Sequence, residues 1–474
     1  MKNIKTPMHH VSIIWILIGF CYWPNAAAAS DLPVKGRPVP EFAHIEPLVQ
    51  DWMTEANMNA AVIGIMRDDQ IIYQRGFGWL NEGFGIPMIE NAKVRLASVV
   101  KPMTAAAIRE LIRDPALDLH LNSRAFNLGQ AGGGVLTLDP WPALGDARLE
   151  NITIRHMLGH RPGWDRDQVG DHTSKECEIA DEMDVSSPPG RTNTMRWILG
   201  QELIHDPGTQ SKYSNEGYMA LGLIIDELAP QGYLKFLHQR VLTPAMGVPW
   251  TEVSRAQTLR ENADRREPYY RGGTCRTCNV FTGCNFSFFS IQKAYGSTDL
   301  EARLSHGGIQ ASAAAALAFA NRYRIGRSGA ITIGRRLADR PLTANEQHGG
   351  SQAGVSTLLR QQTDGTRVFI FFNRNVDDYS AFDFWVQHLG PELAAIPFVD
   401  WPTKECDGFW IATGGTGSGG YGAYDQPFAS FGEAIANTAS GSTFRLFPGS
   451  SDWTGEISSQ LKLDAPNGMV TIGE

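Results

Sequence analysis

Apolar residues recur along the chain with two different periods, and the order of these periods predicts how helices and strands follow one another. Helical spacing predicts a helix over residues 45–57, and alternation on both sides of residues 67–70 predicts a β-hairpin. An Ala-rich helix after Gly307 precedes a second hairpin around Asp364-Gly365, a dipeptide typical of tight turns. Because strands lie near both ends and helices lie between them, we expect one sheet made by both halves of the chain, with a helical region inserted beside it.

The segment that begins at Arg95 predicts a helix whose first turn carries a serine and a lysine. Pro102 has no N–H and therefore fits in or next to the first turn, which places the helix start near Ala97 or Ser98. Ser98 and Lys101 are three positions apart, so their side chains share one face. A hydroxyl and an amine then meet where free backbone N–H groups favour negative charge, which suits a nucleophile and its base. An isolated S-x-x-K pattern, however, is more often an N-cap serine next to a solvated lysine.

Two further segments supply the groups that such a pair needs for acyl transfer, namely another proton-transfer group and an oxyanion hole. Tyr213-Ser214-Asn215 precedes an apolar helix, so a phenol and an amide lie at its N-terminal loop. His348-Gly349-Gly350 lies at the entry to a strand, where two glycines let a substrate approach the backbone closely.

In their order, the three segments resemble the signature elements of the serine β-lactamase and penicillin-binding protein superfamily, above all the branch of class C β-lactamases, D-alanyl-D-alanine carboxypeptidases and family VIII esterases. Two flanking segments, NITIRHMLGHRPGW and HGGIQASAAAALAFANRY, are also similar to sequences of that branch. The resemblance covers about residues 40–395. It implies an α/β fold of the α+β kind, with an antiparallel sheet flanked by helices and an inserted all-helical region.

The resemblance implies a catalytic role for three of these residues. Ser98 would attack a carbonyl carbon and form an acyl-enzyme, which water then hydrolyses. Lys101 and Tyr213 would share the proton transfers, and either of them could be the base. No cofactor and no metal is needed for this chemistry.

Four more residues would bind the substrate or the oxyanion. Asn215 would hold Lys101 and the substrate amide, and His348 would contact the substrate. The backbone N–H groups of Ser98 and Ser351, next to Gly350, would form the oxyanion hole, which is worth about 3 kcal/mol per donor.

One departure from the superfamily concerns substrate choice. Many relatives have Lys-Thr-Gly where this chain has His348-Gly349-Gly350, and there a cation and a hydroxyl hold the substrate's carboxylate. A mostly neutral imidazole and a glycine offer neither group. Loss of a charge-assisted contact costs about 1.5–3 kcal/mol, so hydrolysis is expected to survive while strong β-lactam affinity is not.

Histidine and cysteine pairs raise the question of a metal site. His156 and His160 are four positions apart on a predicted helix, but no third ligand is near them in the sequence, which favours a structural role. After a predicted leader the chain keeps five cysteines, which are Cys177, Cys275, Cys278, Cys284 and Cys406. In an oxidising compartment we expect one or two disulfides across the Gly-rich loop rather than a metal. The odd number leaves the pairing open, and the loop itself fits either a specificity role or simple bracing.

The ends of the chain predict further segments. Lys2 and Lys5 precede an apolar run and the small-residue run Ala26–Ala29, a pattern typical of a secretory signal over residues 1–29. A hydrolase domain is then expected over residues 30–398, its sheet from about 40–97 and 300–398 and its helical part from about 98–299. A Gly-rich linker at 399–424 would lead to residues 425–474, which resemble the first turns of a right-handed parallel β-helix, with a helix and three short strands.

The sequence thus predicts an exported serine hydrolase, periplasmic or secreted from a bacterium, that cleaves an amide or ester bond. D-amino-acid peptides, including cell-wall peptides, and small esters are the expected substrates. The alternatives are a β-lactamase, or a non-catalytic module that binds cell-wall peptide. A net charge of −8 argues against nucleic acid and against an anionic membrane as the main partner, and no stable membrane span is predicted.

Overall fold

A computed structural model describes residues 32–396, except 68, 244–246 and 327–330, and six short segments after them: 409–411, 428–438, 443–446, 449–451, 462–464 and 470–472. The predicted signal at 1–29 and Cys406 lie outside the described residues. Within the described part of the chain, no helix has both the length and the apolar character needed to cross a bilayer.

The main sheet is antiparallel and is made by both halves of the chain, as the hydrophobic pattern predicts. Its strands are listed here in spatial order: β1 (Val34–Lys35), β3 (Gln70–Asn81), β2 (Ala60–Arg67), β14 (Arg367–Phe372), β13 (Val355–Gln361) and β12 (Glu346–Gln352), with β4 (Ile86–Pro87) also paired to β3. The halves meet where β2 pairs with β14, for example Ile63 with Ile370. Both predicted hairpins, β2–β3 and β13–β14, are therefore confirmed.

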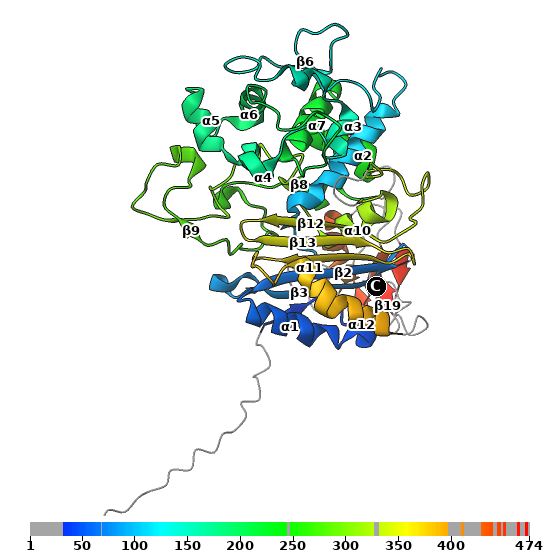
Figure 1. The fold of residues 1–474 in the computed structure, drawn as a ribbon. Helices are drawn as coiled ribbons and strands as arrows, with labels where there is room; N and C mark the ends of the chain where they lie inside the picture. Colours follow the sequence, from blue (N-terminus) through cyan, green and yellow to red (C-terminus); the bar gives the residue numbers. More distant parts are fainter. Residues whose placement is uncertain are drawn as a thin grey trace, which may run out of the picture. The chain divides into compact units, whose positions relative to one another are not determined.

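Helices cover the two faces of this sheet. Strand β2 is buried along its whole length because its side chains alternate between two apolar clusters, with Ile63 in one and Val62 in the other. The first cluster holds α1 (Ile45–Glu55), α11 (Ala381–Phe384) and α12 (Gly390–Ala395), and the second holds α10 (Ala313–Arg322). Figure 1 shows α1, α11 and α12 together at one side of the sheet.

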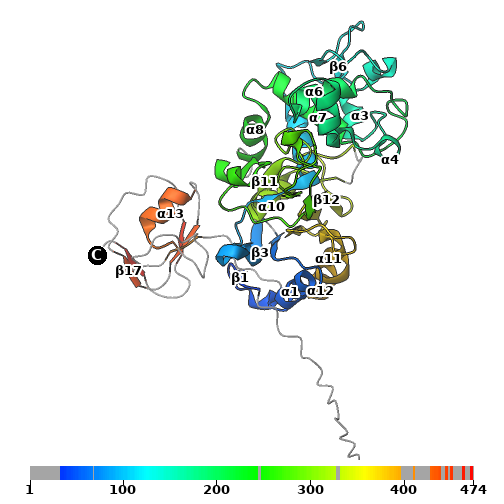
Figure 2. The same cartoon turned by 90° about the vertical axis from the view of Figure 1, so that its left-hand side faces the viewer.

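The middle of the chain is mainly helical. Its helices are α2 (Val100–Ile112), α3 (Ile154–Leu158), α4 (Arg166–Val169), α5 (Glu176–Glu182), α6 (Gly190–Ile198), α7 (Asn215–Leu228) and α8 (Tyr233–Phe236). Both views show α3, α6 and α7 gathered at the end of α2 that lies away from the sheet (Figures 1 and 2). The expectation of an all-helical region is wrong in detail, because paired strands of two or three residues also occur there; such strands are too short to leave a period in the sequence. They are β6 (Phe126–Asn127), β7 (Leu136–Thr137), β8 (Val253–Arg255), β9 (Thr274–Cys275) and β10 (Ile291–Gln292).

Two disulfides fasten the cysteine-rich loop that lies between β9 and β10. Cys177 of α5 bonds Cys284, and Cys275 bonds Cys278. The expectation of one or two disulfides at this loop agrees with these bonds. The first of them joins segments that are 107 residues apart in the sequence, so it fixes the loop to the helical region.

The C-terminal segments form parallel pairs, which is the pairing that coils of a parallel β-helix would have. β15 (Phe409–Ile411) pairs with β16 (Thr443–Leu446), β16 with β18 (Lys462–Asp464), and β17 (Gly449–Ser451) with β19 (Val470–Ile472). Helix α13 (Phe431–Asn437) contributes Phe431 to a small apolar cluster with Ile411 and Phe444. Strand β15 falls inside the segment predicted as a linker, and the domain boundaries themselves stay a prediction.

Candidate active site

Ser98 and Lys101 meet at the start of α2. Ser98 lies in a 3₁₀ turn, η3 (Ala97–Val99), that leads directly into the helix. The Lys101 ammonium lies 3.1 Å from the Ser98 hydroxyl and also donates to the backbone carbonyl of His306 at 2.9 Å. Ala97 has φ of 47°, in the left-handed region that only glycine adopts readily. The backbone is therefore strained at the residue before Ser98, as is common at functional sites.

Tyr213 reaches the same hydroxyl from the loop before α7. Its phenol donates to the Ser98 hydroxyl at 2.7 Å, and the Lys101 nitrogen lies 4.8 Å from the centre of its ring. Ser214 caps α7 by accepting from the backbone N–H of Gly217 at 3.0 Å, so the helix end fixes where Tyr213 sits. The three residues predicted as catalytic thus form one hydrogen-bonded group.

Burial sets the protonation of the two proton-transfer groups. It lowers the pKa of Lys101 to about 7, with Asp171 opposing the shift and Arg166 adding to it. Burial raises the pKa of Tyr213 to about 12. Near neutral pH, Lys101 can therefore be an amine that accepts a proton, whereas Tyr213 is a phenol that already carries one.

Asn215 and Asp171 form the next layer of polar contacts. The Asn215 side-chain N–H donates to the Asp171 carboxylate at 2.5 Å, while its amide oxygen is buried and accepts from no described residue. The family resemblance implies that Asn215 holds Lys101. Among the described residues, the Lys101 ammonium donates to the backbone carbonyl of His306. Asp171 lies outside the segments that resemble the superfamily, and His306 begins one of the two flanking segments, where nothing marks its backbone carbonyl as a contact of Lys101.

Strand β12 packs against η3 and carries His348, Gly350 and Ser351, with Gly349 between the first two. Its neighbour on β13, Thr357, donates to the carbonyl of Leu96 at 2.9 Å, which ties the sheet edge to η3. His348 is buried, its Nε2 has no hydrogen-bond partner among the described residues, and burial together with Lys101 lowers its pKa to about 4. The imidazole is therefore neutral near pH 7, as the sequence predicts. Ser351 is exposed at this edge.

Gly350 lies too close to η3 for any side chain. A Cβ there would collide with the Leu96 carbonyl oxygen and the Thr357 hydroxyl, whereas a Cβ on Gly349 would come no closer than 3.8 Å to any atom beyond its chain neighbours. We expect Gly350→Ala to push β12 away from Ser98 and to lower kcat/KM about 100-fold, since an ångström of misplacement has that effect. Steady-state hydrolysis of a chromogenic ester measures this, with Gly349→Ala as the matched variant. Equal activity of the two variants would contradict the prediction.

His160 has a place in the site that sequence reasoning missed. Its ring stacks on Tyr213 with centroids 4.7 Å apart, and its Nδ1 accepts from the backbone N–H of Ser214 at 3.1 Å. Burial lowers its pKa to about 3, so this ring is also neutral. His156 instead caps α3, together with Thr153. Within the described residues, no three His, Cys, Asp or Glu side chains are grouped to hold a metal ion.

Arg166 also lies at the site, and the sequence analysis did not single it out. It begins α4, it is exposed, and its guanidinium lies 5.5 Å from the centre of the Tyr213 ring. No ion pair among the described residues involves it, although Asp165 and Asp167 on either side both pair with Lys212. A cation without a carboxylate partner therefore lies next to the residue that contacts Ser98.

Comparisons with known proteins agree with this geometry. A family model described as Beta-lactamase matches residues 45–426. Protein flp of Staphylococcus aureus (strain COL) is 26% identical over 205 residues, which are 42% of this chain and 36% of that relative. The match therefore spans well under half the length of this curated relative.

Two solved structures share the fold. The octameric penicillin-binding protein homologue from Pyrococcus abyssi has a TM-score of 0.50 and 18% identity, covering 76% of this chain and 79% of its own. The D-amino acid amidase from Ochrobactrum anthropi SV3, solved with D-phenylalanine, has a TM-score of 0.50 and 16% identity, covering 72% of this chain and 95% of its own. The fold that the sequence predicts is confirmed.

Proposed function

The chain belongs to the Beta-lactamase family, and from this premise we propose that it is an exported serine hydrolase that cleaves an amide or ester bond through an acyl-enzyme. The single observation that carries the proposal is the contact of one hydroxyl with two proton-transfer groups. The Lys101 ammonium and the Tyr213 phenol both lie within 3.1 Å of the Ser98 hydroxyl oxygen. A protein that only bound a ligand would not need a buried lysine with a pKa of about 7 in this position.

In the proposed reaction, neutral Lys101 takes the hydroxyl proton as the Ser98 oxygen forms a bond to the carbonyl carbon of the substrate. The carbonyl π electrons move onto oxygen, and the backbone N–H groups of Ser98 and Ser351 are proposed to hold this oxyanion. Tyr213 gives its proton to the leaving nitrogen or oxygen as that bond breaks, and it regains a proton from Lys101. Water then attacks the acyl-enzyme by the same steps in reverse and releases the acid.

Arg166 supports a substrate that carries a negative charge. The His348-Gly349 pair offers no cation and no hydroxyl for a carboxylate. The Arg166 guanidinium beside Tyr213, which joins no ion pair among the described residues, offers both charge and donors. We therefore favour peptides or amides of D-residues with a free carboxylate over neutral esters. The D-amino acid amidase among the structural neighbours fits the D-residue in this choice, whereas the carboxylate rests on Arg166 alone.

Arg166→Gln is expected to raise KM for a carboxylate-bearing substrate by about 10-fold or more, the usual effect of losing a charge-assisted contact. KM for an uncharged ester of the same acyl group should change by less than about twofold. Paired steady-state kinetics on the two substrates measure the difference. If both KM values rise together, Arg166 shapes the site rather than recognising charge.

The N-terminal pattern and the disulfides support export. Disulfides such as Cys177–Cys284 persist in oxidising compartments. A periplasmic or secreted location would also place the enzyme beside cell-wall peptides, which carry D-residues.

Covalent labelling tests the proposal. The folded protein is incubated with a fluorophosphonate and, separately, with a fluorescent penicillin, and intact mass followed by peptide mapping locates any adduct. We expect a stoichiometric adduct on Ser98 with at least one probe. Fast turnover of the penicillin would favour the alternative of a β-lactamase. No adduct with either probe would favour a non-catalytic module that binds cell-wall peptide.

A further inference from the structure

A loop of unusual composition projects between β9 and β10, at the left of Figure 1. Three of its side chains are mostly in solvent: Phe286 is 63% exposed, Phe288 86% and Phe289 84%. The rings of Phe286 and Phe288 contact each other at 5.8 Å between centroids. Soluble proteins seldom leave such a contiguous apolar cluster in water unless it meets a partner or a membrane.

The base of this loop is held firmly. Its disulfides are Cys275–Cys278 and Cys177–Cys284, and the buried Val280 donates from its backbone to the Gly296 carbonyl at 2.9 Å. The loop therefore keeps its shape without help from the phenylalanines. These side chains do not stabilise the fold by burial, so their presence has to be explained by something outside it.

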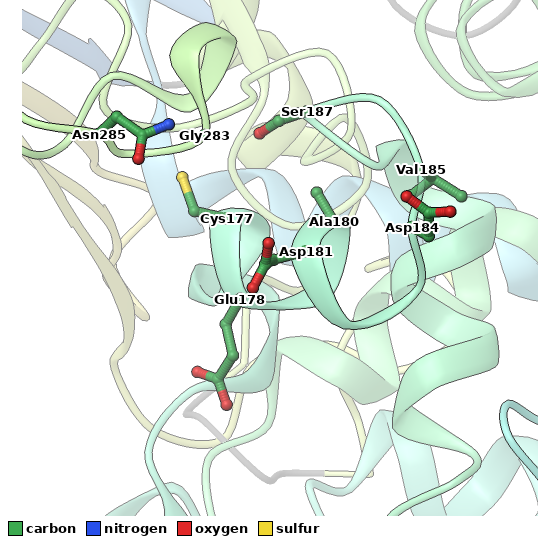
Figure 3. Close-up of a pocket in the computed structure, with 9 residues that line it drawn as sticks. All are labelled: Cys177, Glu178, Ala180, Asp181, Asp184, Val185, Ser187, Gly283 and Asn285. Carbon is green, nitrogen blue, oxygen red and sulfur yellow. The ribbon is translucent and has the colours of Figure 1, made fainter.

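The pocket beside the loop does not receive the phenylalanines. It lies where α5 faces Gly283 and Asn285, and Figure 3 shows Cys177 between the two segments. Carboxylates of Glu178, Asp181 and Asp184 belong to its lining, and none of the three exposed phenylalanines does. The aromatic side chains are thus not folded back into this pocket.

The charge of the loop differs from that of the whole chain. Residues 268–298 contain no Asp or Glu but contain Arg271, Arg276 and Lys293, whereas the chain has a net charge of −8. Arg271 pairs with Glu82, while Arg276 and Lys293 are exposed and join no ion pair among the described residues. The Ser287 backbone N–H donates to the Arg276 carbonyl at 2.9 Å, so Arg276 belongs to the same turn as Phe286 and Phe288. The carboxylates of the neighbouring pocket belong instead to α5 and the residues just after it.

We propose that this loop is an interfacial anchor, which inserts Phe286, Phe288 and Phe289 into the boundary of a lipid membrane that has anionic headgroups. Arg276 and Lys293 contact those headgroups. A folded protein partner would need a preformed pocket for each protruding ring, whereas the acyl boundary of a bilayer accepts rings of any orientation. The proposal does not depend on the proposed hydrolase activity. It adds a local membrane contact to a chain whose overall charge argues against membrane as its main partner.

Vesicle co-sedimentation tests the anchor. The chain without its predicted signal, residues 30–474, is mixed with vesicles of phosphatidylcholine alone or with phosphatidylglycerol added. Replacing Phe286, Phe288 and Phe289 together by serine should lower the partition coefficient by at least about 100-fold, because each ring contributes about tenfold on burial. The matched variant Phe382→Ser, which changes a 43% exposed ring of α11, should bind as the wild type does.

Two more measurements make the outcome decisive. Replacing Arg276 and Lys293 with glutamine should weaken binding to the anionic vesicles by about fivefold per residue and leave binding to phosphatidylcholine unchanged. Circular dichroism of the triple serine variant shows whether its fold is intact, and fluorophosphonate labelling of Ser98 in the same variant reports on the hydrolase proposal separately. Absence of wild-type binding, or equal binding by the triple variant, would overturn the anchor. A wild-type dimer that the triple variant loses, without vesicle binding, would show instead that the loop docks on protein.

Discussion

Replacing Ser98 with alanine is expected to abolish probe labelling and to lower kcat/KM for a chromogenic ester by about 10⁴-fold or more, as loss of a nucleophile does in other serine hydrolases. The reason is that the Lys101 ammonium and the Tyr213 phenol both contact this one hydroxyl. Neither group therefore has another nucleophile to activate when the hydroxyl is removed. Labelling by intact mass and steady-state hydrolysis of the same sample measure the two effects.

A matched variant separates this effect from damage to the fold. Ser123→Ala removes a hydroxyl that contacts only its local neighbour His120, and it should keep wild-type activity. Circular dichroism should be the same for both variants. Residual turnover above about 1% of wild type in Ser98→Ala would mean that another group attacks the substrate.

Lys101→Met is expected to lower kcat by about 10³–10⁴-fold, the usual contribution of a general base. Because the pKa of Lys101 is about 7, wild-type kcat/KM should rise as the pH increases through 7 and then level off. If Tyr213 were the base, the rate would continue to rise toward its pKa of about 12. A pH profile from 5 to 10 distinguishes these cases.

Lys101→Met is also expected to raise the free energy of unfolding near pH 6. The pKa of Lys101 is about 7 in the folded protein and 10.5 as a model value, so the unfolded chain binds more protons between these values. The free energy of unfolding of the wild type should therefore increase from pH 7 toward pH 10 because of Lys101. Below pH 7 the buried Lys101 is charged, and there its burial destabilises the fold most. Methionine avoids that cost but leaves the His306 carbonyl without its donor, so we expect a net gain of about 2 kcal/mol at pH 6.

Urea unfolding at pH 6 and pH 10 measures the gain, which should shrink at the higher pH. Lys235→Met is the matched variant, because Lys235 is exposed and should show no such pH dependence. If Lys101→Met were less stable than wild type at pH 6, burial of the Lys101 ammonium would not be the destabilising factor that we infer from its lowered pKa.

Three short segments, taken together as a family resemblance, were enough to find the central group of the site. Ser98 and Lys101 share a face because they are three positions apart on one helix, and Tyr213 is adjacent to the cap of α7. Hydrophobic periods also predicted both hairpins of the sheet and the joining of its two halves. The hairpins depend on neighbours in the sequence, whereas the joining of the halves, where Ile63 pairs with Ile370, was predicted from the order of the elements along the chain.

Other parts of the site come from segments far apart in the sequence. His306 contacts Lys101 across 205 positions through a backbone carbonyl, a group that every residue has. His160 stacks on Tyr213, and Arg166 lies beside it, although neither residue lies in the three signature segments. His160 lies in a flanking segment that resembles the family, but nothing in that segment indicates its stacking on Tyr213.

The sequence by itself determined the fold class, the order of the strands in the two hairpins and the identity of the candidate nucleophile and its two proton-transfer partners. Only the tertiary structure decided the protonation of those partners, the position of the strained turn at Ala97 against β12, and the exposure of the Phe286–Phe289 tip. The physical reason is that spacing along a helix or strand is a local property. Desolvation and close approach depend instead on everything that folding packs around a group.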